Sequence, residues 1–194
     1  MMVDNATALR ASVRTLFEYI GEDPARQGLS NTPDRWMKAW RDTWASGYGV
    51  NPLDVLTVFD AEGTDEMVVI RDIPVWSHCE HHLAPFFGVA HVGYIPDKHI
   101  AGLSKFKRLV DVYARRLQNQ ERLTCQVADC ILEVLEPIGV GVVMECRHTC
   151  MESRGVQTQG SATVTTKLHG AMKEQATTRA EFLAMVNARL GGTL

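Results

Sequence analysis

The order of strand-like and helix-like hydrophobic patterns along the chain constrains its fold most strongly, because the strand-like segments come in two adjacent pairs. Residues 67–70 and 86–95 have the β-branched and aromatic content typical of strands. Residues 140–150 and the threonine-rich residues 161–167 form the second pair. Strands that follow each other without an intervening crossover favour antiparallel pairing. The sequence therefore predicts an α+β fold, in which an antiparallel four-stranded sheet is backed by helices.

Helical periods lie before, between and after these pairs. The segment Thr32-Pro33-Asp34 is typical of a helix start, with the threonine hydroxyl as N-cap and an acid near the helix dipole. The tryptophan stripe that follows is typical of core or interface packing. We expect an N-terminal helical region over residues 1–65 and a sheet domain over residues 66–194. The expected helices are residues 7–20, 32 to about 46, about 102–117, about 120–135 and about 178–190.

Charge and cysteine usage restrict the class of protein. The 194 residues carry a net charge of -3, without the basic face that broad nucleic-acid binding needs. No apolar run reaches membrane-spanning length, and the N-terminus lacks the pattern of a secretory signal. Five cysteines at irregular spacing do not resemble a disulfide framework. We therefore expect a cytoplasmic protein that binds neither nucleic acid nor membrane.

The densest cluster of reactive side chains is the segment from His78 to His82. Cys79 and His82 are three residues apart, so one helical turn would place both side chains on the same face. A thiolate and an imidazole that converge there are good ligands for zinc. His81 would point away from that face and be free to move protons.

A third ligand can come from the strand that ends at Cys150. With a period of two, Cys146, His148 and Cys150 would share one face of that strand. Cys150 would then complete a three-ligand zinc site with one open position, and His148 would serve beside it as an acid or base. For Cys146 we prefer a role as a small buried hydrophobe, whereas for Cys150 packing and metal binding are comparably good interpretations.

Seven motifs occur in order along the chain: Asp23-Pro24-Ala25-Arg26, Thr32-Pro33-Asp34-Arg35, Cys79-Glu80-His81-His82, Gly102-Leu103-Ser104-Lys105, Gln120-Glu121-Arg122-Leu123, His148-Thr149-Cys150 and Thr178-Arg179-Ala180-Glu181-Phe182-Leu183. This ordered set covers nearly the whole chain and resembles the GTP cyclohydrolase I family. The sequence departs from the family pattern at Gln27, Asn31 and Asn119, none of which is a position expected to bind metal or substrate or to take part in catalysis. The resemblance implies the tunnelling fold and the zinc-dependent conversion of GTP to 7,8-dihydroneopterin triphosphate, with release of formate.

The resemblance also implies roles for single residues. His148 matches the acid that protonates the purine ring nitrogen, and His81 matches a second catalytic histidine near the ribose. Ser104 resembles a residue of the later ribose rearrangement, although a serine at a helix start is often simply an N-cap. One zinc ion per subunit would be held by Cys79, His82 and Cys150.

Recognition of GTP is implied by a second group of polar residues. Glu121 resembles the guanine reader, because a carboxylate can accept from N1–H and the exocyclic amine together. Gln120 would assist at the base edge, and the alternative for both is a polar first helical turn. The cations implied for the triphosphate, each of which alone would be an ordinary surface charge, are Lys105, Arg108, Arg154, Arg35 and Lys38. The family assembles as a decamer of two pentamers with sites where subunits meet, which the resemblance implies here too.

Three alternatives compete with this interpretation. A zinc nucleobase deaminase needs a glutamate two residues after its ligand histidine and a Pro-Cys-x-x-Cys pair, and the chain has neither. A non-catalytic zinc scaffold of the same fold would use Cys146 as a fourth ligand, and the presence of both His81 and His148 argues against it. A nucleic-acid zinc module is disfavoured by the net charge.

Overall fold

The computed structural model describes residues 5–188, which form two compact units that divide between Ser46 and Gly47. Residues 47–65 belong to the second unit and contain the short elements η3 (Pro52–Asp54) and β1 (Val58–Asp60). The functional boundary expected between residues 65 and 66 stays a prediction.

The first unit is helical. Helix α1 (Asn5–Tyr19) contacts α2 (Thr32–Ala39), which continues as the π-helical turn η1 (Trp40–Trp44). The tryptophan stripe packs on itself within this unit, with edge-to-face ring centroids 5.8 and 5.4 Å apart. The expected N-cap was wrong by one position: the cap residue is Asn31, and the Thr32 hydroxyl instead donates to the Gly28 carbonyl at 3.3 Å.

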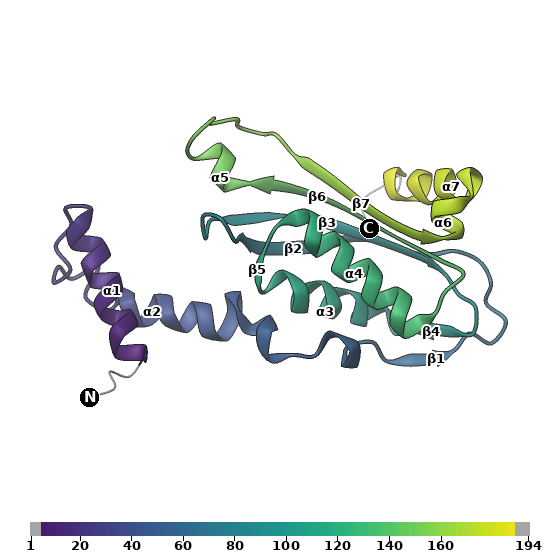
Figure 1. Ribbon diagram of the computed structural model, residues 1–194, viewed down its shortest axis with the longest axis horizontal. Coiled ribbons are helices and arrows are strands. Elements are labelled where there is room, and N and C mark those ends of the chain that lie inside the picture. Colours follow the sequence, from purple (N-terminus) through teal and green to yellow (C-terminus); the bar gives the residue numbers. More distant parts are fainter. Residues whose placement is uncertain (1–4, 189–194) are drawn as a thin grey trace. The chain divides into compact units, whose positions relative to one another are not determined.

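The second unit is built on a five-stranded sheet of order β5-β2-β3-β6-β7 (Figure 1). The four long strands β2, β3, β6 and β7 pair with one another in antiparallel fashion, which confirms the expected architecture. An unexpected fifth strand, β5, runs parallel to the end of β2 and is only two residues long, too short to leave a period in the sequence. A separate pair is formed by β1 and β4 (His99–Ala101). The strands of the main sheet are β2 (Val68–Cys79), β3 (Pro85–Ile95), β5 (Leu117–Gln118), β6 (Gly139–His148) and β7 (Thr163–Gly170).

Strand β2 extends nine residues beyond the expected end at Ile70. The register with β3 shifts between Ile70 and Ile73, and Asp72 in this bulge has φ +55°. The sequence pattern does not predict the remainder of the strand, because the charges of Arg71 and Asp72 and the proline at position 74 break the apolar alternation that is typical of strands. The extension matters because it carries the chain to Cys79.

Two helices cover one face of the sheet. Helices α3 (Leu103–Ala114) and α4 (Gln120–Leu135) bury their apolar sides against β2 and β6 in one continuous core. Helix α4 begins and ends where the sequence predicts, with Asn119 as its N-cap: the Asn119 side chain accepts from the Arg122 N–H at 2.8 Å.

The opposite face carries the C-terminal helices α6 (Ala171–Glu174) and α7 (Ala176–Asn187) (Figure 1). Phe182 of α7 is fully buried in a second, smaller cluster with Met172 and Val143. The helix end expected near Leu190 lies outside the described residues.

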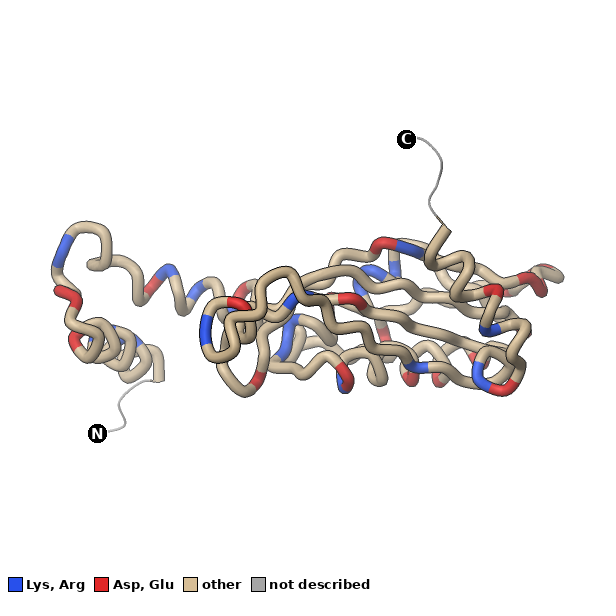
Figure 2. The backbone as a smooth tube through the Cα atoms, turned by 90° about the horizontal axis from the view of Figure 1, so that it is seen from above, with Lys and Arg blue, Asp and Glu red and all other residues tan. Residues whose placement is uncertain are grey.

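Charged residues of both signs are interspersed along the second unit, without a stretch of one sign (Figure 2). Among the described residues, no helix is both long and apolar enough to span a bilayer.

Candidate metal centre and active site

A tight turn between β2 and β3 presents the first two ligand candidates. The Cys79 carbonyl accepts from the N–H groups of His82 at 3.3 Å and Leu83 at 2.8 Å, and Leu83 has φ +54°. The turn therefore acts as the single helical turn expected, and the His82 Nδ1 lies 3.8 Å from the Cys79 sulfur. His81 does not point fully away, since its Nδ1 lies 3.7 Å from the same sulfur.

Cys150 lies beside Cys79 and His82 as expected, but the element that carries it is not the expected strand. Strand β6 ends at His148, and Thr149 begins the short helix α5 (Thr149–Glu152), so Cys150 is not on the strand. The Thr149 hydroxyl donates to the Pro85 carbonyl at 2.6 Å, which holds α5 against the start of β3. The period-two argument was thus wrong for Cys150, and a helical turn brings its sulfur to the site.

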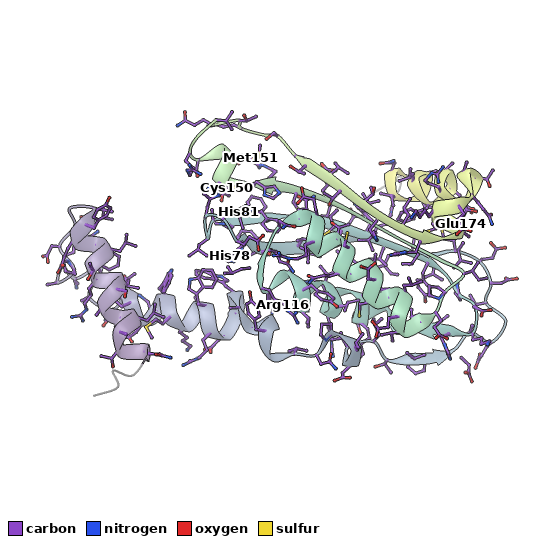
Figure 3. All side chains as sticks on the ribbon, viewed as in Figure 1. His78, His81, Arg116, Cys150, Met151 and Glu174 are labelled. Atoms are coloured by element: carbon purple, nitrogen blue, oxygen red, sulfur yellow. The ribbon has the colours of Figure 1, made fainter. Side chains whose placement is uncertain are left out.

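One ligand atom from each of Cys79, His82 and Cys150 lies within 4.8 Å of the other two. His81 and Cys150 lie together at this end of the sheet (Figure 3). Burial and then the neighbouring Cys79 sulfur raise the pKa of Cys150, while the charge of Arg154 opposes the rise. Two sulfurs and an imidazole are a donor set that a metal ion can occupy.

Cys146 takes no part in this group. It is 1% exposed within the main core, and burial raises the pKa of its thiol to about 12. Cys146 therefore does not supply the fourth ligand that a closed scaffold site would require.

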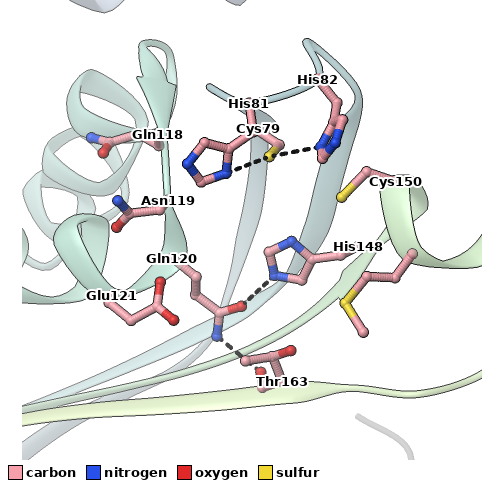
Figure 4. A pocket seen from close by; sticks show the side chains of 11 residues that line it. Cys79, His81, His82, Gln118, Asn119, Gln120, Glu121, His148, Cys150 and Thr163 are labelled. Atoms are coloured by element: carbon pink, nitrogen blue, oxygen red, sulfur yellow. Dashed lines mark hydrogen bonds between the residues drawn. The ribbon is translucent and has the colours of Figure 1, made fainter. Parts of the chain in front are cut away.

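The ligand group lies at the wall of a cavity of about 250 Å³ (Figure 4). The cavity brings together residues from β2, β5, α4, β6, α5 and β7, far apart in sequence. Its lining residues are Cys79, His81, His82, Gln118, Asn119, Gln120, Glu121, His148, Cys150, Met151 and Thr163. Both predicted catalytic histidines and the predicted guanine reader are in this set.

His148 is held at the cavity by stacking and by a hydrogen bond. Its ring lies parallel to Phe86, with centroids 4.7 Å apart and an interplanar angle of 11°. Its Nε2 lies 2.8 Å from the Gln120 side-chain oxygen. Burial lowers the pKa of His148, opposed by the negative charge of Glu121.

Gln120 and Glu121 differ in accessibility although they are adjacent. Glu121 is exposed at the cavity, which suits a residue expected to meet a ligand. Gln120 is 1% exposed, and its amide is bonded to protein groups rather than open to a base edge.

An ion pair links the ligand turn to helix α4. Arg122 donates to both carboxylate oxygens of Glu80, at 3.4 and 2.5 Å, and Asn119 donates to one of them at 3.1 Å. Hydrogen bonds from Arg122 hold the pKa of Glu80 below its ordinary value. Sequence reasoning missed Asn119, although an asparagine directly before a predicted helix is an N-cap signal.

The five predicted cations and the predicted catalytic residue Ser104 fall into three groups. Ser104, Lys105 and Arg108 lie on α3, whose first residues follow β4 and the Ala101–Tyr94 hydrogen bond. Tyr94 lies at the end of β3 away from Pro85 and the cavity, and Ser104, Lys105 and Arg108 are not among the residues that line the cavity. Arg154 is exposed beside α5, close enough to affect Cys150. The remaining two, both exposed on α2 of the first unit, are Arg35 and Lys38.

Comparison with known proteins gives one consistent result. A family profile described as GTP cyclohydrolase I matches residues 9–187. The chain is 53% identical over 178 residues to GTP cyclohydrolase 1 of Janthinobacterium sp. (strain Marseille), covering 91% of this chain and 89% of that protein. It is 54% identical over 175 residues to GTP cyclohydrolase 1 of Nitrosospira multiformis, and the match covers 89% of this chain and 91% of that protein. GTP cyclohydrolase 1 of Wolinella succinogenes is 47% identical over 186 residues, and the match covers 95% of this chain and 99% of that protein.

Proposed function

The chain belongs to the GTP cyclohydrolase I family, and from this membership we propose that it opens the guanine imidazole ring of GTP by hydrolysis. Release of the ring carbon as formate and reclosure of the ring system then yield 7,8-dihydroneopterin triphosphate. The observation that carries the proposal is the cavity in which a Cys-His-Cys group, two further histidines and an exposed glutamate meet.

Zinc is the metal proposed for Cys79, His82 and Cys150, with one ion per subunit. Two sulfurs and one imidazole suit a borderline-soft ion, whereas magnesium and calcium prefer oxygen donors. Three protein ligands leave a coordination position open, as in catalytic rather than structural zinc sites. When bound, zinc supplies Lewis acidity for the activation of water.

Proton transfer is proposed for the two remaining histidines of the cavity. His148, half-buried against Phe86, would deliver a proton to the purine ring nitrogen during attack. His81, whose side chain is 66% exposed, would act nearer the ribose. Its exposure at the cavity supports contact with the more distant parts of a nucleotide.

Glu121 is proposed to read guanine. Its carboxylate would accept hydrogen bonds from N1–H and the exocyclic amine, a pair of donors that adenine does not present on that edge. Adenine would therefore leave the carboxylate unpaired, which is the source of discrimination against ATP.

Binding of the triphosphate is proposed to require a second subunit. Ser104, Lys105 and Arg108 lie at the opposite end of the sheet from the cavity of their own chain, so a neighbouring copy would have to supply them. This supports the decamer of two pentamers expected for the family, with sites at subunit boundaries. Arg154, Arg35 and Lys38 would add further phosphate contacts. Ser104 would act in the ribose rearrangement. The proposed location is the cytoplasm, where the free thiols stay reduced.

Incubation of the zinc-replete protein with GTP tests the proposed function. We expect formate and a pterin that becomes fluorescent after oxidation, in equal amounts, and neither product from ATP. A zinc-replete protein that leaves GTP unchanged would contradict the proposal.

A further inference from the structure

The side-chain amide of Gln120 has a fixed orientation. The two hydrogens on its Nε2 are shared among three acceptors: the backbone carbonyls of Met144 at 3.1 Å and Thr163 at 2.9 Å, and the Thr165 hydroxyl oxygen at 3.0 Å. Backbone carbonyls can only accept, so the amide nitrogen, and not the oxygen, must face them. At 1% exposure the side chain has no solvent to bond with instead. The position of Oε1 follows from that of Nε2.

A chain of hydroxyl groups reinforces this orientation. The Thr124 hydroxyl donates to the Gln120 backbone carbonyl at 2.8 Å, and the Thr165 and Thr124 hydroxyl oxygens lie 2.7 Å apart. Because the Thr124 hydrogen is committed to Gln120, the Thr165 hydroxyl must donate to Thr124. Thr165 then has lone pairs free to accept from the Gln120 amide. The donors and acceptors in this series of hydrogen bonds are therefore compatible with only one orientation of the Gln120 amide.

The fixed amide determines which nitrogen of His148 carries hydrogen. Gln120 Oε1 lies 2.8 Å from His148 Nε2, and an amide oxygen can only accept. Nε2 must therefore be protonated, and in the neutral imidazole Nδ1 presents its lone pair. Stacking on the fully buried Phe86 holds the ring plane. Figure 4 shows the other ring nitrogen directed towards the side of the cavity where Cys79, His82 and Cys150 meet.

We propose that Gln120 is a positioning residue, which holds His148 in the Nε2–H tautomer and directs Nδ1 into the cavity. The proposal rests on the proposed function only in that His148 exchanges a proton with the substrate there. Nδ1 is then the ring atom that faces the substrate. Gln120 acts through His148 and does not contact the guanine edge, because its two amide hydrogens are shared among the oxygen atoms of Met144, Thr163 and Thr165.

The tautomer can be measured without substrate or metal. Zinc-free protein labelled with 15N-histidine is studied by solid-state NMR at a pH of about 8.5, where imidazole is ordinarily neutral. The His148 signals are identified by their loss in His148→Ala. We expect the Nε2–H tautomer in the unmodified protein and a mixture in Gln120→Leu, which lacks the acceptor. Protonation of His148 at Nδ1 in the unmodified protein would overturn the proposal, whether or not the variant folds.

Kinetics separate positioning from base recognition. In zinc-loaded Gln120→Leu we expect kcat to fall about 10- to 100-fold, with KM for GTP changed less than about twofold, as for other residues that orient a reacting group. A raised KM with unchanged kcat would instead show that Gln120 contacts the base. Gln126→Leu is the matched control, since it removes a hydrogen-bonded glutamine from the same helix without touching His148. If the unmodified protein does not convert GTP, the proposed function fails while the NMR result still decides the tautomer.

Discussion

At the residue scale, two cysteines near the end of β6 have opposite environments. Cys146 points into the core and is 1% exposed, whereas Cys150, four positions later, is half-buried at the cavity. Burial without a partner makes Cys146 a neutral thiol, because burial raises its pKa to about 12. Cys150 has Cys79 and His82 within ligand distance. Position relative to other ligands, and not residue type, separates the two.

Metal analysis of single variants tests this distinction. Cys150→Ser should lose zinc, while His148→Ala should keep about one zinc per subunit and lose turnover, because His148 is outside the three-ligand group. Bound zinc is measured by elemental analysis after gel filtration. Cys146→Ala is the matched control and should keep its metal. Release of zinc from His148→Ala would show that a ligand had been mistaken for an acid.

At the element scale, helix α7 is attached to the sheet by the buried Phe182 ring and by hydrogen bonds to its backbone, with Leu183 and Val186 packed beside the ring. The Phe182 ring lies directly on two glycines: a Cβ at Gly93 would come within 2.6 Å of it and one at Gly141 within 2.7 Å. The Arg71 guanidinium donates to the last carbonyls of α7, Met185 at 3.0 Å and Ala188. A positive charge at that end also suits the helix dipole.

Removal of the Phe182 ring should therefore weaken the attachment of α7. Phe182→Ala is expected to lower the free energy of unfolding by about 3 to 5 kcal/mol, because it leaves a cavity over two glycines that cannot fill it. Denaturant titration at a fixed protein concentration measures the change. Met185→Ala on the same helix, at a side chain 38% exposed, should change it by less than about 0.5 kcal/mol. Equal effects of the two substitutions would refute the packing account.

At the scale of the whole molecule, the cavity and the α3 cations lie at opposite ends of one sheet. Helix α3 begins beside the Ala101–Tyr94 hydrogen bond and ends at Ala114, shortly before Leu117, which pairs with His78 beside the ligand turn. A single copy therefore cannot bring Lys105 to its own His148. A closed assembly in which each copy contacts the next solves this geometric problem.

Mixed assemblies of two inactive variants test the shared site. Lys105→Ala and His148→Ala should each be inactive alone, and co-expression in equal amounts should restore about one quarter of normal turnover, since half the copies supply each intact part. Lys107→Ala is the control, because Lys107 bonds Asp111 at 2.5 Å on the same helix and should leave turnover intact. No recovery in mixed assemblies would mean that each site belongs to one copy.

The sequence by itself determined the order of the long strands and the main helices and the bounds of α4. It also identified seven of the residues that meet in the cavity, namely Cys79, His81, His82, Gln120, Glu121, His148 and Cys150. These follow from local periods, helix caps and the motifs of the family, which are properties of short segments. Tertiary structure alone decided that β2 continues through Arg71, Asp72 and Pro74 to Cys79, since sheet pairing overrides a broken local pattern.

Tertiary structure also decided which element places the Cys150 sulfur at the ligand group, and which groups the Gln120 side chain bonds. The end of β6 and the start of α5 depend on the Thr149–Pro85 contact, which joins positions 64 residues apart. The role of Gln120 depends on acceptors 24 to 45 residues away. Residue identity determines which hydrogen bonds and metal ligands are available, but only long-range packing determines which partners come within reach.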